Sequence, residues 1–246
     1  VESTSTTAYG GTDEITTGSG SDLIVGGRYG DTIQAGDGNN VVLGDSGRIT
    51  ADPDATPRWP GQTMSIGKIE TTEPDDGGDD TITTLGGADI ILGGTGSDTI
   101  RAGAGIDVIF GDQGEVLSAG GANRVVTYAN PSWPGYEPAP WYEGYTYTAT
   151  SIRDANAGAA DLIYGEGGGD YILGQQGRDV IFAGSGDDDV YGGHNQAMGL
   201  DEGDIIDAGT GNDVIAGDNA SIQRTDAAVS PRFRALEGER IYGEGP

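Results

Sequence analysis

The sequence contains no cysteine, so it can form neither disulfide bonds nor thiolate metal sites. It is also poor in basic residues: Lys and Arg total 12 against 40 Asp and Glu, and the formal net charge is −28. This charge argues against binding to nucleic acid or to anionic membranes, because both are themselves negatively charged. Cations are the natural partners of such a chain.

Long hydrophobic runs are missing as well, so the sequence predicts no membrane insertion. The first ten residues, VESTSTTAYG, lack the basic and apolar pattern of a signal peptide. Hydrophobic residues make up only 35% of the chain, which is little for a conventional core. Low hydrophobicity with high charge is also typical of disorder. The chain is therefore either disordered or held together by something other than apolar burial.

Glycine is abundant instead, with 47 of 246 residues, and much of it lies in a nine-residue repeat that favours the ordered alternative. An Asp, or once an Asn, recurs at nine-residue intervals, and Ile or Val stands two positions after each. The repeated polar positions are Asp13, Asp22, Asp31, Asn40, Asp80, Asp89, Asp98, Asp107, Asp161, Asp170, Asp179, Asp188, Asp204 and Asp213. Three related phrases close the blocks of repeats: GDSGRI, GDQGEV and GDNASI.

One unit, Gly93–Arg101, shows what this spacing can build. GGTGSD has the composition of a tight turn, in which glycine permits positive φ and close approach of neighbouring backbones. TIR then forms a short strand whose Ile faces one side and whose neighbours face the other. Stacked copies would align backbone carbonyls and the carboxylate of Asp98 in a column of oxygens. Ca²⁺ takes six to eight such oxygen ligands.

These units resemble the nonapeptide repeats of the repeats-in-toxin (RTX, hemolysin-type) family, G-G-x-G-x-D followed by x, an aliphatic residue and x. The resemblance implies an all-β fold, a right-handed parallel β-roll or β-helix solenoid with hairpin-like inserted arms, in which two units make one turn. It also implies Ca²⁺ ions, about six or more, between turns on the same side. The implied pairs are Asp13 with Asp31, Asp22 with Asn40, Asp80 with Asp98, Asp89 with Asp107, Asp161 with Asp179, and Asp170 with Asp188.

All fourteen repeated positions are thus candidate metal ligands, with differences among them. Asn40 lacks a charge, so we expect a weaker site with Asp22. Arg28-Tyr29 and Gln175-Gln176 replace glycine at flexible positions. The insert after His194 breaks the spacing and leaves open whether a site joins Asp188 to Asp204.

The blocks and inserts divide the chain into alternating parts. They are block one (1–49), an arm (50–76), block two (77–117), a Trp/Tyr/Pro-rich arm (118–156), block three (157–222) with a short insert (194–203), and a final arm with the start of a fourth block (223–246). The closing ERIYGEGP echoes DLIYGEGG at Asp161, so we expect a segment of something longer.

The residues that flank each inward Ile predict one polar and one apolar outer face. Glu14, Thr16, Thr32 and Gln34 contrast with Leu23, Val25, Val41 and Leu43, and block two repeats this. Block three is less regular. Large apolar faces are rarely left in water. We expect the inserts to fold back over the apolar sheet, with docking on a neighbouring copy as the alternative. RVVTYA and YTYTATSI alternate like the two strands of a hairpin.

Other signals carry less weight. GDSG at Gly44 resembles the segment around a serine-protease nucleophile, but its sister phrases hold Gln113 and Asn219 in place of Ser46, so we expect no enzyme. We expect His194, the only histidine, to be a surface turn residue rather than a ligand, and the sequon at Asn219 to be fortuitous. We interpret the aromatic residues of the inserts as packing rather than a sugar platform. They are Trp59, Trp133, Trp141, Tyr128, Tyr136, Tyr142, Tyr145 and Tyr147.

Three functions fit this pattern. The first is a calcium-dependent structural repeat module of a large secreted or cell-surface protein, of adhesin, matrix-fibre or surface-layer type, with like copies head to tail or side by side. The second is the C-terminal folding and secretion module of a type I secreted enzyme. The third is a sugar- or ice-binding module. Because one buried Ile or Val per nine residues offsets little of the backbone ordering cost, we expect the chain to fold only with Ca²⁺, outside the cell.

Overall fold

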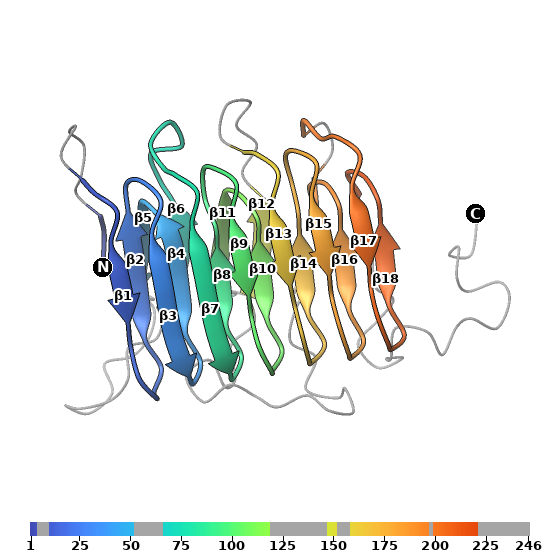
Figure 1. Cartoon of the computed structure of the whole chain (residues 1–246), viewed down its shortest axis with the longest axis horizontal. Helices are drawn as coiled ribbons and strands as arrows, with labels where there is room; N and C mark the ends of the chain where they lie inside the picture. Colours follow the sequence, from blue (N-terminus) through green and yellow to red (C-terminus); the bar gives the residue numbers. More distant parts are fainter. Residues whose placement is uncertain (4–9, 52–65, 119–146, 152–157, 197–198, 221–246) are drawn as a thin grey trace, which may run out of the picture.

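The computed structural model describes residues 1–3, 10–51, 66–118, 147–151, 158–196 and 199–220. The described chain winds as a flattened solenoid of short strands (Figure 1). Fourteen of the strands form two seven-stranded parallel sheets, and four form an antiparallel sheet. No described segment is a helix that could cross a membrane.

Successive nine-residue units alternate between the two parallel sheets, which we call sheet I and sheet II. Sheet I contains β1 (Glu14–Thr16), β3 (Thr32–Asp37), β7 (Thr81–Gly86), β9 (Thr99–Arg101), β13 (Leu162–Tyr164), β15 (Val180–Phe182) and β17 (Ile205–Asp207). Sheet II contains β2 (Leu23–Gly27), β4 (Val41–Asp45), β8 (Ile90–Leu92), β10 (Val108–Phe110), β14 (Tyr171–Leu173), β16 (Asp189–Tyr191) and β18 (Val214–Ala216). One coil of the solenoid is therefore two units, as the resemblance implies.

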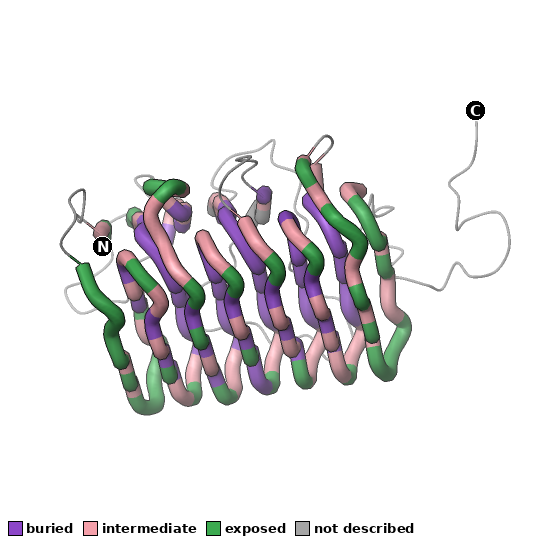
Figure 2. Tube along the Cα trace, turned by 45° about the horizontal axis from the view of Figure 1, so that its top comes forward, coloured by how far each residue is buried: buried purple, intermediate pink, exposed green. Residues whose placement is uncertain are grey.

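The core between the sheets is made of the aliphatic residue at the centre of each strand. Ile33 of sheet I and Ile91 of sheet II have no exposed surface, and the same holds for most of their counterparts. In-register pairing stacks like on like, for example Ile82 on Ile100 and Ile109 on Ile172. Along the strands of sheet I, buried and exposed positions alternate (Figure 2). The interior is thus a thin aliphatic layer of one Ile or Val per unit, to which the buried Ala35, Ala102 and Ala183 add.

A second hydrophobic core covers the outer face of sheet II. The first two inserts, called arm one and arm two, are counted from here on with the residues that lead into them (47–49 and 114–117). Arm one supplies β5 (Gly47–Ala51) and β6 (Ile66–Thr71), and arm two supplies β11 (Gly114–Ser118) and β12 (Tyr147–Ser151); together they form an antiparallel sheet in the order β12-β11-β6-β5, the arm sheet. Its apolar residues pack on the outward residues of sheet II. The cluster comprises Ile49, Ile66, Ile69 and Val116 from the arms and Val41, Leu43, Ile90, Leu92, Val108, Phe110, Tyr171, Leu173 and Tyr191 from sheet II. The prediction that the inserts cover the apolar sheet is confirmed for these strands.

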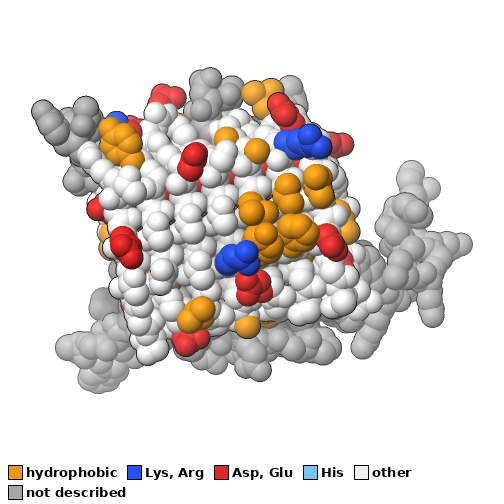
Figure 3. Space-filling model, viewed as in Figure 1, with side chains coloured by type: hydrophobic (Ala, Val, Ile, Leu, Met, Phe, Trp, Pro, Cys, Tyr) orange, Lys and Arg blue, Asp and Glu red, His pale blue; other side chains and the backbone are white. Residues whose placement is uncertain are grey.

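The outer face of sheet I changes character along the solenoid. Its first strands present threonines, whereas the later strands present a compact apolar patch (Figure 3). In that patch the rings of Tyr164 and Phe182 stack with centroids 5.2 Å apart, and the guanidinium of Arg101 lies 3.9 Å from the Tyr164 ring centroid. The three residues occupy the same register position on β9, β13 and β15. Sheet I is therefore polar only over its first half.

Several predictions concern residues outside the described part of the chain. They are the tryptophans Trp59, Trp133 and Trp141, the tyrosines Tyr128, Tyr136, Tyr142 and Tyr145, the strand predicted over 124–129, Ser221 of the sequon and the closing segment 239–246. Within the described residues, the partner of β12 is β11.

Candidate metal centre

The fourteen repeated polar residues lie at the two long edges of the solenoid, where the chain passes from one sheet to the other. The edge from which arm one, arm two and the short insert leave, the upper one in Figure 1, is called the arm edge, and the opposite one the plain edge. The arm edge carries Asp13, Asp31, Asp80, Asp98, Asp161, Asp179 and Asp204. The plain edge carries Asp22, Asn40, Asp89, Asp107, Asp170, Asp188 and Asp213.

Hydrogen bonds tie each edge into a continuous column. In every step, the backbone N–H of one repeated residue donates to Oδ1 of the repeated residue in the next coil. The distance is 2.8 Å from Asp80 to Asp98 and 2.8 Å from Asp161 to Asp179. On the plain edge it is 3.0 Å from Asp22 to the amide oxygen of Asn40. All six predicted pairs lie side by side in this way.

The columns also cross arm one, arm two and the short insert, which the nine-residue spacing alone does not reveal. The backbone N–H of Asp31 donates to Oδ1 of Asp80, and that of Asp98 donates to Oδ1 of Asp161, although 49 and 63 residues separate the partners. After the short insert, Asp179 pairs with Asp204 and Asp188 with Asp213. The possible link between Asp188 and Asp204 is therefore not formed, because these residues belong to opposite edges. Alternation of units between the sheets would have indicated this.

On the arm edge, the second carboxylate oxygen of the repeated aspartates from Asp31 onward points to a cradle formed by glycine. A Cβ placed on Gly93 would overlap both Oδ2 of Asp98 and the carbonyl oxygen of Gly111. A carboxylate oxygen and a carbonyl oxygen from adjacent coils thus converge where glycine leaves space. The same triple recurs along the arm edge: Gly26 with Asp31 and Gly44, Gly44 with Asp80 and Gly93, Gly111 with Asp161 and Gly174, Gly174 with Asp179 and Gly192, and Gly192 with Asp204 and Gly217.

The plain edge is built differently. The position of the cradle glycine is taken there by Thr or Ala, with Gly165 as the exception. The hydroxyls of Thr17 and Thr84 donate to the carbonyls of Ala35 and Ala102 in the next coil. A hydroxyl therefore occupies part of the space that is open on the arm edge.

The carboxylates of the columns are buried and close to one another, which disfavours their charged form. Burial raises the pKa of Asp80 to about 8, and the charge of Asp98 adds to this. Burial likewise raises the pKa of Asp179 to about 8 and that of Asp89 to about 6. Burial, reinforced by Asp112 and Asp98, raises the pKa of Asp161 well above its usual range. Without a compensating positive charge, the columns are electrostatically costly at neutral pH.

The donor atoms fit a hard divalent cation such as Ca²⁺. The buried Oδ2 atoms of Asp31, Asp80, Asp98, Asp161, Asp179 and Asp204 on the arm edge, and of Asp22 and Asp89 on the plain edge, have no hydrogen-bond partner. Among the described residues, no three Asp, Glu or His side chains converge as a site made of side chains alone would require. A cation would therefore draw its ligands from both carboxylates and turn carbonyls, an all-oxygen set that Ca²⁺ prefers.

Asn40 shows how the chain treats a turn without a charge. Its side-chain nitrogen donates to the carbonyl oxygens of Gly38 at 3.0 Å and Gly36 at 3.4 Å, both in its own turn. The amide thus satisfies carbonyls that would otherwise be available to a cation. This gives a physical reason for the expectation of a weaker site with Asp22.

Two further buried carboxylates, which the repeat does not identify, fasten the bases of the arms. Oδ1 of Asp45 accepts from the N–H of Gly78 at 3.1 Å, where arm one returns, and Oδ2 accepts from the N–H of Thr95 in the next coil. Asp112 does the same with Ala159 at 3.2 Å and Gln176 at 2.7 Å. Burial, with the charges of Asp80 and Asp98, raises the pKa of Asp45 to about 9. In the sequence, these two carboxylates can be recognised as the Asp of the block-closing phrases GDSGRI and GDQGEV.

The prediction that His194 lies at the surface is wrong. Its side chain is fully buried, because the short insert folds over it: a Cβ on Gly199 would overlap the ring, and Nε2 lies 3.1 Å from the carbonyl oxygen of Leu200. The neighbouring Asn195 accepts from the N–H of Ser151 at 3.0 Å. The short insert thus contacts β12 of the arm sheet.

Gln175 and Tyr29, two of the residues that replace glycine, keep the left-handed backbone of the repeat, with φ of 81° and 69°. Gln175 is fully buried: its Oε1 accepts from the N–H of Asp112 at 3.1 Å, and its Nε2 donates to the carbonyl of Gln113 at 2.7 Å. These contacts hold the base of arm two and compensate for the unfavourable φ.

Comparison with known proteins agrees with this geometry. The family model described as the RTX calcium-binding nonapeptide repeat (4 copies) matches residues 16–48, 75–100, 92–115, 164–194 and 198–220. These stretches contain most of the two columns. Searches of curated proteins and of solved structures found no match.

Proposed function

Because the chain belongs to the family of RTX calcium-binding nonapeptide repeat proteins, we propose that it is a calcium-stiffened structural module of a large cell-surface or matrix protein. Calcium-binding repeat modules of this family are typical of secreted proteins, which supports an extracellular location. The observation that carries the proposal is the pair of columns, which runs unbroken through the described coils and crosses arm one, arm two and the short insert. Because the columns run through all the described coils, the stiffness of the solenoid would depend on bound cations along its length.

The columns give calcium a role that is mechanical rather than catalytic. The repeated aspartates accept from the backbone N–H of the neighbouring coil through Oδ1, and from Asp31 onward those of the arm edge offer Oδ2 to the cradle. A cation bound there would neutralise carboxylates whose pKa is raised by burial and would link adjacent coils. The low-calcium cytoplasm would then leave the chain unfolded, and millimolar calcium outside would fold it. We propose no catalytic activity for this chain.

Force spectroscopy tests the mechanical role. The chain, held at its two ends, should unfold at discrete forces in millimolar calcium and should extend as a flexible polymer in a chelator. Equal unfolding forces in both conditions would contradict the proposal.

The make-up of the full polypeptide that carries this sequence separates the two leading functions. Many like blocks favour the structural module, whereas an adjoining hydrolase domain favours the secretion module of an enzyme.

A further inference from the structure

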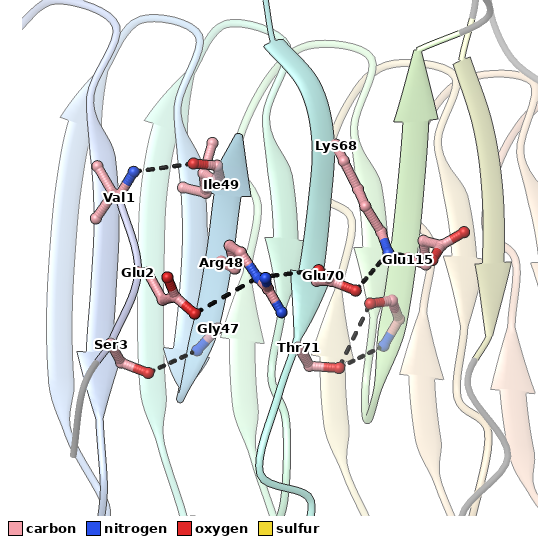
Figure 4. Close-up of polar contacts among 11 residues, drawn as sticks. Val1, Glu2, Ser3, Gly47, Arg48, Ile49, Lys68, Glu70, Thr71 and Glu115 are labelled. Carbon is pink, nitrogen blue, oxygen red and sulfur yellow. Dashed lines mark hydrogen bonds and ion pairs between the residues drawn. The ribbon is translucent and has the colours of Figure 1, made fainter. Parts of the chain in front are cut away.

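The arm sheet is paired at its β5 edge by residues outside the arms. Val1–Glu2–Ser3 lie antiparallel to β5 (Figure 4). The N–H of Ile49 donates to the carbonyl of Val1 at 2.8 Å, and the N–H of Ser3 donates to the carbonyl of Gly47 at 2.9 Å. The amino group of Val1 donates back to the carbonyl of Ile49 at 2.9 Å. Three residues therefore extend the arm sheet by one short strand.

The same arrangement occurs a second time, inside the sheet, where β6 of arm one pairs with β11 of arm two. Ile69 lies opposite Val116 and Glu70 opposite Glu115, as Val1 lies opposite Ile49 and Glu2 opposite Arg48. The sequences agree: Val-Glu-Ser lies on Gly-Arg-Ile, and Ile-Glu-Thr lies on Gly-Glu-Val. The two pairings share register, direction and side-chain pattern.

One unusual hydrogen bond is also shared. The N–H of Gly47 donates to the hydroxyl of Ser3 at 3.2 Å, and the N–H of Gly114 donates to the hydroxyl of Thr71 at 3.1 Å. A side-chain hydroxyl of the incoming strand thus meets the N–H at the start of the outgoing arm strand. Only Ser or Thr places a hydroxyl at that distance from the backbone.

In both pairings, the glutamate at the centre of the added strand (Glu2 or Glu70) forms an ion pair with a basic side chain. Arg48 lies 3.6 Å from Glu2 on one side and 3.2 Å from Glu70 on the other. At the second pairing, Glu115 stands in the place of Arg48, and Lys68 bridges it to Glu70 at 2.8 and 2.5 Å. Lys68 is the only lysine of the chain. Its position relieves the repulsion between two acids that lie directly opposite each other.

Apolar burial does not explain the pairing at β5. Val1 keeps 64% of its surface exposed, whereas its counterpart Ile69 is fully buried. The strand 1–3 is held by its backbone bonds, by the Ser3 hydroxyl and by the ion pair of Glu2. The contacts made at the edge itself are therefore sufficient to place it.

We propose that the first strand of an arm, at the edge that faces away from the second strand of the same arm, is a binding site for an extended strand of the pattern aliphatic–Glu–Ser/Thr. The site is Gly47–Ile49 in arm one and Gly114–Val116 in arm two. Its occupant is a return strand of an arm: β6 occupies the site on β11, and Val1–Ser3 occupy the site on β5 as a strand of the same kind. This recognition joins arm two to arm one and arm one to residues 1–3, independently of the cation columns, by the addition of a strand to a sheet edge.

The test uses the chain without residues 1–3, in saturating calcium, with its fold checked by circular dichroism. Hydrogen exchange of the Ile49 amide should accelerate by roughly tenfold or more, because its acceptor is removed. A synthetic peptide of residues 66–72, IGKIETT, added at millimolar concentration, should restore protection. A scrambled peptide of the same composition should not.

Point variants of the intact chain keep the test independent of the truncation. Ser3→Thr should preserve protection of the Gly47 amide and Ser3→Ala should lose it, just as Thr71→Ser should preserve and Thr71→Val lose protection of Gly114. Unchanged Ile49 exchange after truncation, or equal protection by both peptides, would overturn the proposal. So would a dimer of the truncated chain that the peptide fails to dissociate, since the edge would then recognise a second copy.

Discussion

The backbone N–H of Asp98 donates to Oδ1 of Asp161 at 2.7 Å, across an interval of 63 residues that contains the whole of arm two. The preceding step of the same column, from Asp80 to Asp98, has a length of 2.8 Å over only 18 residues. The column is thus the same whether or not an arm interrupts the turn. Arm one and arm two are both inserted after the second residue of an arm-edge turn, beyond the cradle glycine, so the cradle is left intact.

The first prediction concerns the charge of Asp161. Asp161→Asn keeps an oxygen that can accept the hydrogen bond but removes a charge from the cradle. We expect the calcium concentration at half-folding to rise by about tenfold, since calcium affinity follows the number of charged ligands. In metal-stripped buffer the same change should favour folding, because a buried carboxylate is removed. Calcium titrations followed by circular dichroism measure both effects.

Asn40→Asp is the reverse experiment on the plain edge. It replaces the amide that donates to Gly36 and Gly38 with a carboxylate, so those carbonyls become available and a charge is added. The half-folding calcium concentration should fall. Asp187→Asn serves as a control. Oδ1 of Asp187 accepts hydrogen bonds from the backbone N–H and the side-chain amide of Asn212, and this exposed contact lies outside the columns. An equal effect of the control and of Asp161→Asn would contradict a special role for the columns.

The second prediction concerns the glycine cradle. Gly93→Ala places a methyl group where Oδ2 of Asp98 and the carbonyl of Gly111 converge. Because both neighbours are held in the column, we expect a loss of stability of about 1–3 kcal/mol in calcium, in the range of overpacking. Urea unfolding measures it. Gly18→Ala is the matched control, since no described atom lies within 4 Å of its added Cβ.

The third prediction concerns pH in the absence of metal. Burial raises the pKa of Asp80 to about 8 and that of Asp45 to about 9. In the unfolded chain, the pKa of an aspartate is about 3.9. A pKa raised by folding favours the folded state below the unfolded value and ceases to do so as pH rises through the folded value. The metal-stripped chain should therefore gain β-structure as pH is lowered from about 9 to about 4. A loss of β signal as the pH falls over this range would contradict the raised pKa values of these buried carboxylates.

The fourth prediction concerns the core beneath the arms. Ile69→Ala removes a fully buried side chain between the arm sheet and sheet II. We expect a loss of about 2–5 kcal/mol, as for large-to-small changes in other cores. Leu85→Ala, at a side chain that is 57% exposed, should change stability little. Urea unfolding in saturating calcium compares the two, and equal effects would show that the arms do not pack as described.

Much of this fold could be predicted from the sequence because its repeat is local. The spacing of Asp98 and Asp107, with Ile two residues after Asp98, determines a turn, a strand and an inward residue without knowledge of distant contacts. The alternation of units also identified the apolar outer face of sheet II. Pairings across the inserts depend on where an arm returns, which no short pattern encodes, so the link from Asp98 to Asp161 required the structure.

The arm sheet shows the same limit. The pairing of β6 with β11 joins strands from different arms, and the repeat gives no register for it. The burial of His194 escaped prediction because it depends on Gly199 and Leu200 folding over the ring. The arms also add a second hydrophobic core that the count of one aliphatic residue per unit leaves out. The quantity to be measured is therefore how much bound cations contribute to folding stability compared with apolar burial.

The most direct measurement of that balance is the far-ultraviolet circular dichroism of the metal-stripped chain at neutral pH, before and after addition of millimolar calcium. If cations in the two columns hold the coils together, the stripped chain should show little β signal and should gain it cooperatively on calcium addition. A full β signal without calcium, unchanged when calcium is added, would contradict this account.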